Sequence, residues 1–306
     1  IPAVTVKCKA RRWMVPSNYD PILRTYTGTW DGSMKSAWTN NPAWITYGIC
    51  TEDRFGLGKR IKPFMVDKWE LYRIAQYCDQ LVPNGLGGQE PRFLCDMNLQ
   101  GKADAWSLLR DISAIYRGMT YWAQGQLVMQ ADMPRAQDFD YVFTRSNVID
   151  GKFSYGSASA KTRYTRALVS YDNPANNYDT DVIPFADLDL QRRYGDRPTE
   201  LSAIGCTRAS EAQRRGKWAI LSNNQDRTVS FKTGMEGVIP LPGHIIPVAD
   251  SLLAGREVGG RISLVAGRVI TLDRDTPAKA GDRLIINLPG GRAEGRTVQS
   301  VNGRAV

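Results

Sequence analysis

The stretch DKWELYRIAQYCD at residues 67–79 is the clearest element in the sequence and decides the class of fold. Asp67 and Glu70 have the spacing of a capping box, in which each carboxylate accepts a hydrogen bond from a free backbone N–H at the start of a helix. The apolar residues that follow recur at i, i+3, i+4 and i+7: Leu71, Ile74, Ala75 and Cys78. They fall on one face of a helix, so the stretch predicts an amphipathic helix packed on a core.

Two further helices are expected on either side of this stretch. Asn41 as N-cap and Pro42 at the first helical position predict a helix that runs to about Asp53. A third helix is expected over residues 102–117, with Gly118 as a left-handed C-terminal cap. Its buried face is expected to contain Ala105, Leu108, Leu109, Ile112 and Tyr116.

Strands are expected to surround these helices. Residues 1–6 predict a short strand, and residues 120–130 predict a hairpin that turns at Gln124-Gly125. Residues 164–171 predict another strand, and the polar, acidic residues 173–189 predict a loop.

The remainder of the sequence predicts one more helix and then only short strands. Thr207 is expected to cap a helix over residues 207–221, in which Glu211 supports Arg215 four residues later. The strands that follow are separated by glycine and proline, as in a small β-barrel or sandwich: 228–233, 245–248, 261–265, 269–272 and 284–287. The fold class is therefore α+β with several domains, a mixed lobe followed by a small barrel or sandwich.

Composition narrows the function classes. The 306 residues carry 40 basic and 31 acidic side chains, a formal net charge of +9, so attraction to DNA, RNA or an anionic surface is allowed. The basic residues are scattered, however, whereas residues 172–189 hold five aspartates and no lysine or arginine. Five cysteines without a disulfide or zinc spacing indicate a reducing compartment. No run approaches the ~18 to 20 apolar residues of a membrane helix.

The residue types used in catalysis do not form a recognisable set. His244 is the sole histidine, so every triad or two-histidine metal scheme would need it, and its place after Pro242-Gly243 predicts an exposed turn. The glycines of residues 56–59 and 85–88 lack the spacing of a phosphate-binding loop and are expected to end helices.

Four aspartates are the remaining candidates for chemistry: Asp179, Asp181, Asp187 and Asp189. They allow a carboxylate pair or a hard-cation site, but a solvated acidic loop is the preferred interpretation. The sequence therefore predicts no catalytic residue, no cofactor-binding residue, no metal ligand and no cofactor.

Several longer motifs, spread in order over essentially the whole chain, are far more specific than these patterns. They are residues 15–21 (VPSNYDP), 41–45 (NPAWI), 54–58 (RFGLG), 74–79 (IAQYCD), 90–93 (EPRF), 116–119 (YRGM), 211–219 (EAQRRGKWA) and 241–243 (LPG). Together they resemble the tail tip attachment proteins of lambda-like phages, which are the host-specificity or J-type proteins.

The resemblance implies a virion structural protein of a phage or prophage, located at the tail tip and in the host cytoplasm during assembly. It implies a hub that closes the tail tube and supports host attachment and DNA passage. The implied partners are other copies in a homotrimer, neighbouring tail tip and tail tube proteins, and passing DNA through non-specific contacts. A host outer-membrane receptor would be met through a C-terminal part not present here, because the chain is expected to be the middle of a longer polypeptide.

Within such a hub the expected segments are an α+β lobe at 1–134, a mixed region at 135–239 and a β-rich, barrel-like domain at 240–306. Two other function classes remain open. One is a tail-associated hydrolase acting on envelope glycans, with Asp181 and Asp187 as its first candidate residues. The other is a DNA-contacting module, whose binding to random duplex would depend on salt.

Overall fold

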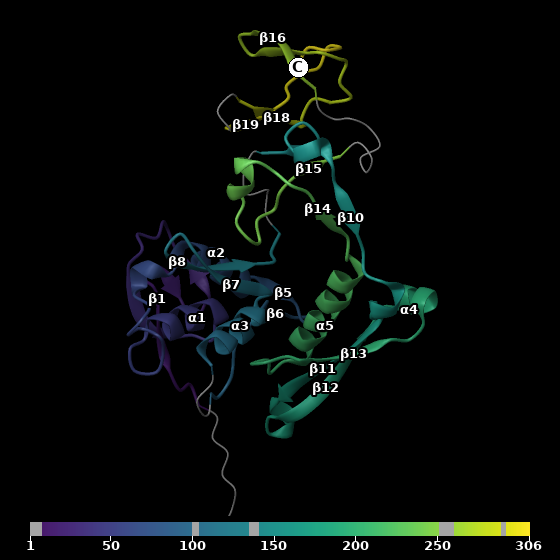
Figure 1. The fold of residues 1–306 in the computed structure, drawn as a ribbon. Helices are drawn as coiled ribbons and strands as arrows, with labels where there is room; N and C mark the ends of the chain where they lie inside the picture. The colour runs from purple at the N-terminus through teal and green to yellow at the C-terminus, as the bar shows by residue number, and fades with distance from the viewer. Residues whose placement is uncertain (1–7, 100–103, 135–140, 251–259, 289–291) are drawn as a thin grey trace, which may run out of the picture. The chain divides into compact units, whose positions relative to one another are not determined.

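A computed structural model describes residues 8–99, 104–134, 141–250, 260–288 and 292–306 (Figure 1). The chain forms two compact units, and each contains two separate stretches of sequence. Unit 1 consists of Ile1–Met133 and Ala158–Asp226, and unit 2 of Pro134–Ser157 and Arg227–Val306. The expected mixture of helices and strands is confirmed. The strand expected at residues 1–6 lies outside the described residues.

The first lobe of unit 1 packs three helices against two antiparallel ribbons. The helices are α1 (Pro42–Thr51), α2 (Lys68–Asp79) and α3 (Ala105–Ile115). The ribbons are β1 (Arg12–Pro16) with β4 (Met34–Trp38), and β7 (Gly118–Ala123) with β8 (Gln126–Ala131). Shorter pairs are β2 (Tyr19–Asp20) with β3 (Thr25–Tyr26), and β5 (Leu81–Pro83) with β6 (Gln89–Pro91).

The helix starts predicted from local signals are confirmed. Asn41 caps α1 by accepting a hydrogen bond from the Ala43 N–H, and Asp67 caps α2 by accepting from the Trp69 and Glu70 N–H groups. The apolar stripe of α2 is buried as expected. The hairpin also turns where predicted, because Gln124 and Gly125 both adopt positive φ (52° and 76°), which matches the right-handed twist of the strands.

The predicted end of α3 is wrong in one detail. Arg117, and not Gly118, takes the left-handed conformation, with φ 60°. Gly118 already lies in β7, where a Cβ would sit 2.2 Å from the ring of Tyr116. The glycine is therefore explained by close packing against an aromatic ring and not by helix capping.

The second lobe of unit 1 is a three-stranded sheet with one long helix. The strand order is β12 (Asp179–Ala186), β11 (Arg166–Asn173), β13 (Pro198–Ser202), with β12 antiparallel and β13 parallel to β11. The helix α5 (Ala209–Asn224) packs on β11, so closely that a Cβ on Gly216 would lie 2.9 Å from a Val169 methyl carbon. A short helix α4 (Leu188–Tyr194) links β12 to β13.

Two sequence predictions for this lobe are corrected. Residues 173–189 do not form a continuous loop, because β12 pairs along its whole length with β11 and packs Ile183 and Phe185 on the core. Thr207 does not cap α5; the helix begins after Arg208 without a side-chain cap, and the Thr207 hydroxyl donates to Asp96 instead.

Unit 2 consists of small two-stranded sheets. They are β9 (Phe143–Thr144) with β15 (Val248–Ala249), β10 (Ser154–Gly156) with β14 (Thr228–Ser230), β16 (Ile262–Ala266) with β17 (Val269–Leu272), and β18 (Arg283–Asn287) with β19 (Ala293–Thr297). Tyr141, Phe143 and Val148 form its buried apolar cluster. In the described part of the chain these strands form no closed barrel, so that expectation is not met.

Four of the five cysteines are buried among apolar side chains, and Cys8 is exposed. Burial raises the pKa of Cys50 and Cys95 to about 12 and that of Cys206 to about 11, and it also raises the pKa of Cys78. These thiols behave as small apolar core residues, as expected for Cys78. No helix in the described residues has the length and apolar character needed to cross a membrane.

Alkylation should therefore distinguish Cys8 from the other cysteines. Treating the native chain with iodoacetamide at mildly alkaline pH should modify one thiol of the five, because the thiolate is the reactive form and four thiols stay protonated and covered. Peptide mass spectrometry should locate the label at Cys8, and Cys8→Ser should abolish it. Native labelling of Cys95 or Cys206 as fast as in denaturant would contradict this packing.

Candidate functional site

A buried carboxylate joins three segments of the first lobe. The Asp79 side chain, at the end of α2, is 1% exposed. It accepts hydrogen bonds from Arg24 Nη1 at 2.7 Å, Tyr26 Oη at 2.9 Å and Asn41 Nδ2 at 2.8 Å. The turn after β2, strand β3 and the start of α1 are thereby held on α2. We call these four residues the Asp79 cluster.

Asn41 serves two helices at once within the Asp79 cluster. Its Oδ1 accepts the Ala43 N–H at the start of α1, and its Nδ2 also donates to the Ala75 carbonyl of α2 at 2.9 Å. The side chain is fully buried and fully used. The N-cap predicted from sequence is therefore also a helix–helix contact, which local pattern alone does not reveal.

Aromatic rings continue from the Asp79 cluster towards solvent. Tyr26 stacks on Tyr19 with ring centroids 4.6 Å apart and meets Tyr72 edge-on at 5.0 Å. Tyr72 in turn stacks on Trp30 at 4.9 Å, and Trp30 contacts the half-exposed Trp69. Such contacts stabilise beyond the apolar area that they bury. These rings form core packing and not an open platform.

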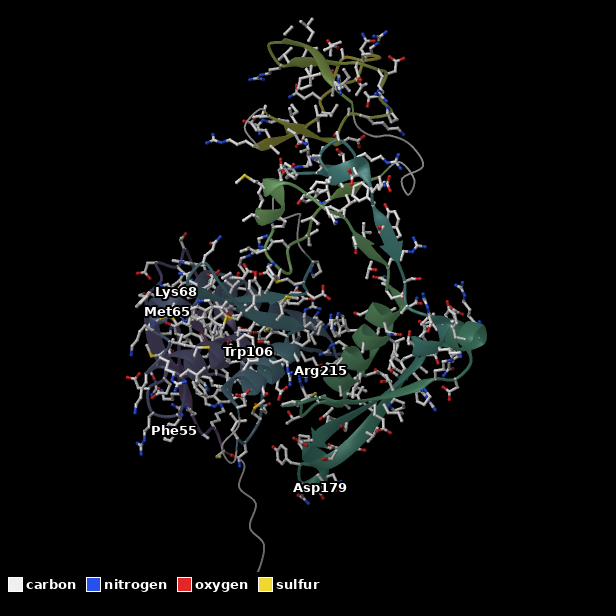
Figure 2. The ribbon with its side chains drawn as sticks, viewed as in Figure 1. Phe55, Met65, Lys68, Trp106, Asp179 and Arg215 are labelled. Atoms are coloured by element: carbon white, nitrogen blue, oxygen red, sulfur yellow. The ribbon has the colours of Figure 1, made fainter. Side chains whose placement is uncertain are left out.

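A second set of buried charges joins α5 to the first lobe. The Glu211 side chain is 1% exposed and lies between two guanidinium groups, those of Arg208 and Arg215. Arg215, labelled in Figure 2, donates to Glu211 Oε1 at 2.6 Å, and the Leu94 N–H of the first lobe donates to Oε2 at 3.3 Å. The predicted support of Arg215 by Glu211 is confirmed, but the pair is buried and not on a solvated face.

Glu90 extends this network from the other lobe. It lies 3.3 Å from Arg208 Nη1 and 2.7 Å from Arg214 Nη1, and the Ser210 hydroxyl donates to it at 2.6 Å. We call Glu90, Arg208, Glu211, Arg214 and Arg215 the Glu211 network. Backbone carbonyls complete it, since Arg208 donates to the Pro91 carbonyl and Arg214 to the Arg92 carbonyl.

Further bonds tie the same two lobes. The Asp96 N–H donates to the Gly205 carbonyl at 2.9 Å, and Trp218 Nε1 donates to Asp132 at 2.8 Å. Each carboxylate of the Glu211 network is occupied by charged or neutral donors. Such an arrangement holds the elements in register. It leaves neither Glu90 nor Glu211 with a free oxygen that could take a proton from a substrate.

Unit 2 contains a smaller cluster of the same kind. Asp250 is buried, lies 3.1 Å from Arg145 Nε and accepts from the Tyr155 hydroxyl at 2.5 Å. Burial and the Asp250 carboxylate raise the pKa of Tyr155 to about 12. The cluster joins the segments around β9, β10 and β15.

The sequence candidates for chemistry are not brought together. His244 lies in a turn, where its N–H donates to the Leu241 carbonyl and its Nδ1 accepts the Leu241 N–H. In residues 56–59 the N–H groups of Leu57 and Gly58 donate to carbonyls at the end of α1, so they serve the protein itself and not a phosphate. The Asn84 side chain folds the loop at 85–88 by accepting from the Leu86 and Gly88 N–H groups.

The four aspartates have separate local roles. Asp187 caps α4, Asp189 pairs with Arg192 at 3.1 Å, and Asp181 accepts from Asn173. Asp179 begins β12. Among the described residues no group of three histidine, cysteine, aspartate or glutamate side chains is arranged to hold a metal ion.

Alkaline pH should unfold unit 1 through its buried phenols. Burial raises the pKa of Tyr19, Tyr26 and Tyr116 above the ordinary 10.0, and the Asp79 charge adds to this for Tyr19 and Tyr26. Above pH 10 the unfolded chain therefore loses protons that the folded chain keeps, so stability falls as pH rises. Circular dichroism and phenolate absorbance should show these three tyrosines ionising together with unfolding. Their complete ionisation in a still-folded chain would contradict the prediction.

The comparison with known protein families agrees with this geometry, in which the buried side chains hold elements of the fold together. Residues 104–265 match the family described as "Putative phage tail protein". The match covers more than half of the chain, so the chain belongs to this family of phage tail proteins.

Two curated relatives are similar over nearly the whole chain, and both are called "Tip attachment protein J". The protein of Escherichia phage SECphi4 is 46% identical over 310 residues, covering 100% of this chain and 27% of the relative. That of Escherichia phage SECphi27 is 45% identical over 305 residues, covering 99% and 25%. The chain thus spans about a quarter of the length of these relatives.

Solved structures show weaker likeness. A tail protein from Neisseria meningitidis MC58 is 14% identical with a TM-score of 0.37, covering 54% of this chain and 49% of that one. The 43 kDa tail protein of prophage MuSo2 from Shewanella oneidensis is 15% identical with a TM-score of 0.33, covering 53% and 47%. Likeness at this level carries no argument about function.

Proposed function

We propose that this chain is a structural segment of a phage or prophage tail tip, where it helps to close the tail tube and supports host attachment and DNA passage. The observation that carries the proposal is the 46% identity to a tip attachment protein along the entire chain. The chain corresponds to about a quarter of that relative, so the role concerns one segment of a longer assembly component.

The buried charges support a load-bearing role. The Glu211 network and the Asp79 cluster occupy the places where distant segments meet, and each joins elements through several charge-assisted hydrogen bonds. Directional bonds of this kind fix one arrangement of packed elements. A tail tip segment must keep its shape until infection begins, and these networks would supply that rigidity.

The finer features belong to the proposal as well. They are a homotrimeric hub, contact with neighbouring tail tip and tail tube proteins, and location at the virion tail tip after assembly in the host cytoplasm. Receptor contact would come from a part of the protein not present in this sequence. The division into segments 1–134, 135–239 and 240–306 also stays a prediction.

Immunoelectron microscopy tests the location. An epitope inserted at Gly87 would lie in an exposed loop, next to Leu86, which is 91% exposed. Insertions at such loop tips are well tolerated. Particles carrying the insertion should bind gold-labelled antibody at the tail tip and remain infectious. Labelling along the tail or on the head, or no label on intact particles, would overturn the proposal.

No specific observation favours the hydrolase alternative. A glycosidase needs two carboxylates about 5 to 10 Å apart across a cleft, whereas Asp181 bonds to Asn173 and Asp187 caps α4. Asp181→Asn and Asp187→Asn should therefore leave any cell-wall degradation by the particle unchanged. Loss of lytic activity in either variant would revive the alternative.

A further inference from the structure

One surface of the first lobe combines positive charge with aromatic rings. Phe55, labelled in Figure 2, is 68% exposed in the loop after α1, and the guanidinium group of Arg54 lies 4.9 Å from its ring centroid. Arg11 lies 4.9 Å from the same ring and 4.6 Å from the ring of Trp13. We call Arg11, Trp13, Arg54 and Phe55 the cationic–aromatic surface. Arginine and aromatic side chains are enriched in protein–protein interfaces.

The loop that presents this surface is held firmly. The Leu57 N–H donates to the Ile49 carbonyl at 2.9 Å, and the Gly58 N–H donates to the Glu52 carbonyl at 3.1 Å. A Cβ on Gly56 would lie only 2.1 Å from the Ile49 carbonyl oxygen, so only glycine lets the loop press against the end of α1. A preformed surface loses less conformational freedom when a partner binds.

Positive charge on and beside this surface is only partly neutralised. Arg11 pairs with Glu52 at 3.3 Å. Across the described residues, no ion pair joins Arg54, Lys59 or Arg60 to a carboxylate, and all three side chains are exposed. The surface therefore suits a partner that brings carboxylates and an apolar or aromatic group.

The end of the β11–β12 hairpin, residues 172–182, has the opposite character. It carries Asp172, Asp179 and Asp181 and no lysine or arginine. Tyr178, 37% exposed, and the exposed Val182 supply contact area beside the charges. Figure 2 labels Asp179 at this end of the hairpin. No ion pair among the described residues reaches these three aspartates.

We propose that the hairpin end at residues 172–182 of one copy docks on the cationic–aromatic surface of a second copy of this chain. The inference rests on the proposed function, in which copies of the chain associate. The two surfaces are complementary in charge and lie on different elements of the same molecule. A contact between two different surfaces of identical chains is head-to-tail, and it forms a ring when the rotation between copies closes.

A nucleic acid suits the cationic–aromatic surface less well. Guanidinium groups already lie over Trp13 and Phe55, whereas binding to single strands uses open aromatic faces on which bases stack. The acidic hairpin end offers a compact partner with both charge and contact area.

Charge reversal tests the docking in the full 306-residue chain. Sedimentation velocity over a range of protein and salt concentrations should show self-association that weakens with salt. Arg54→Glu and Asp179→Lys should each weaken it at least about tenfold, because each places like charges in contact. The double variant Arg54→Glu/Asp179→Lys should associate again, since the charges are exchanged. Arg110→Glu makes the same charge change on α3 and should have no effect.

Mixing provides a second measurement. The two single variants should each associate poorly alone but should associate with one another when mixed. The altered hairpin end of the Asp179→Lys chain then meets the altered surface of the Arg54→Glu chain. The native acidic hairpin end of the Arg54→Glu chain meets the native positive surface of the Asp179→Lys chain. Circular dichroism should show all variants folded. A wild-type chain that stays monomeric, or a double variant that stays dissociated, would overturn the docking. The docking would also be overturned if Arg54→Glu abolished binding to duplex DNA but left self-association unchanged. That result would assign the surface to nucleic acid.

The outcome is separable from that of the proposed function. Gold label at the tail tip together with a monomeric chain would remove the docking alone. Self-associating chains in particles that lack tip label would remove the tail tip location and leave the docking in place.

Discussion

Replacing Glu211 with alanine should lower the free energy of unfolding of unit 1 by about 3 to 5 kcal/mol, the usual cost of removing one member of a buried ion pair. The substitution leaves Arg208 and Arg215 facing each other, with side chains 19% and 13% exposed, without the carboxylate between them. It also removes the acceptor of the Leu94 N–H. Urea unfolding followed by circular dichroism measures the change.

The matched control is Glu200→Ala. Glu200 is an exposed residue of β13 in the same lobe, so its replacement should change the unfolding free energy by no more than about 0.5 kcal/mol. Equal stabilities for the two variants would show that the Glu211 network does not hold α5 on the first lobe. A loss seen at low salt only would contradict burial of the charges, since buried pairs are screened much less than exposed ones.

Asp79→Ala should destabilise the first lobe by a similar amount, about 3 to 5 kcal/mol. Three donors lose their acceptor at once, including Arg24, whose side chain is only 15% exposed. Tyr26→Phe removes one donor and leaves the carboxylate with two, so it should cost only about 1 kcal/mol. Thermal and urea unfolding of both variants should give this order.

Asp189→Ala is the control for Asp79→Ala. The Asp189 side chain is 89% exposed and pairs with an exposed arginine, a contact worth about 0 to 1 kcal/mol. Should Asp79→Ala be as mild as this control, the Asp79 cluster would be incidental to the packing of α1 on α2. If Tyr26→Phe were as unstable as Asp79→Ala, the loss of unfolding free energy would come from the missing phenol hydroxyl and not from the missing carboxylate.

Features set by neighbouring residues were predictable from the sequence. The caps at Asn41 and Asp67 and the turn at Gln124-Gly125 depend on atoms within three residues, so their patterns indicate the structure directly. The stripe of α2 was equally clear because apolar spacing and burial coincide. The family resemblance, carried by motifs spread along the chain, predicted the class of protein that the comparison confirms.

Features set by distant residues were not predictable. Thr207 has the right residue type for a cap, but Asp96, over one hundred residues earlier, takes its hydroxyl. The acidic composition of 173–189 concealed β12, which Ile183 and Phe185 hold on the core. Glu90 and Asp79 look like surface residues until their partners are known. Asp79 gave one signal, its position directly after the apolar stripe of α2.

The order of segments along the chain has a consequence for synthesis on the ribosome. The segment Pro134–Ser157 of unit 2 separates the two parts of unit 1 in the sequence. Glu90 can bond to Arg214 only after a further 124 residues have been synthesised. Contacts between residues so far apart in sequence form slowly, because the loop between them must close first. The nascent first lobe would thus expose an unmatched acidic residue and backbone carbonyls until α5 emerges.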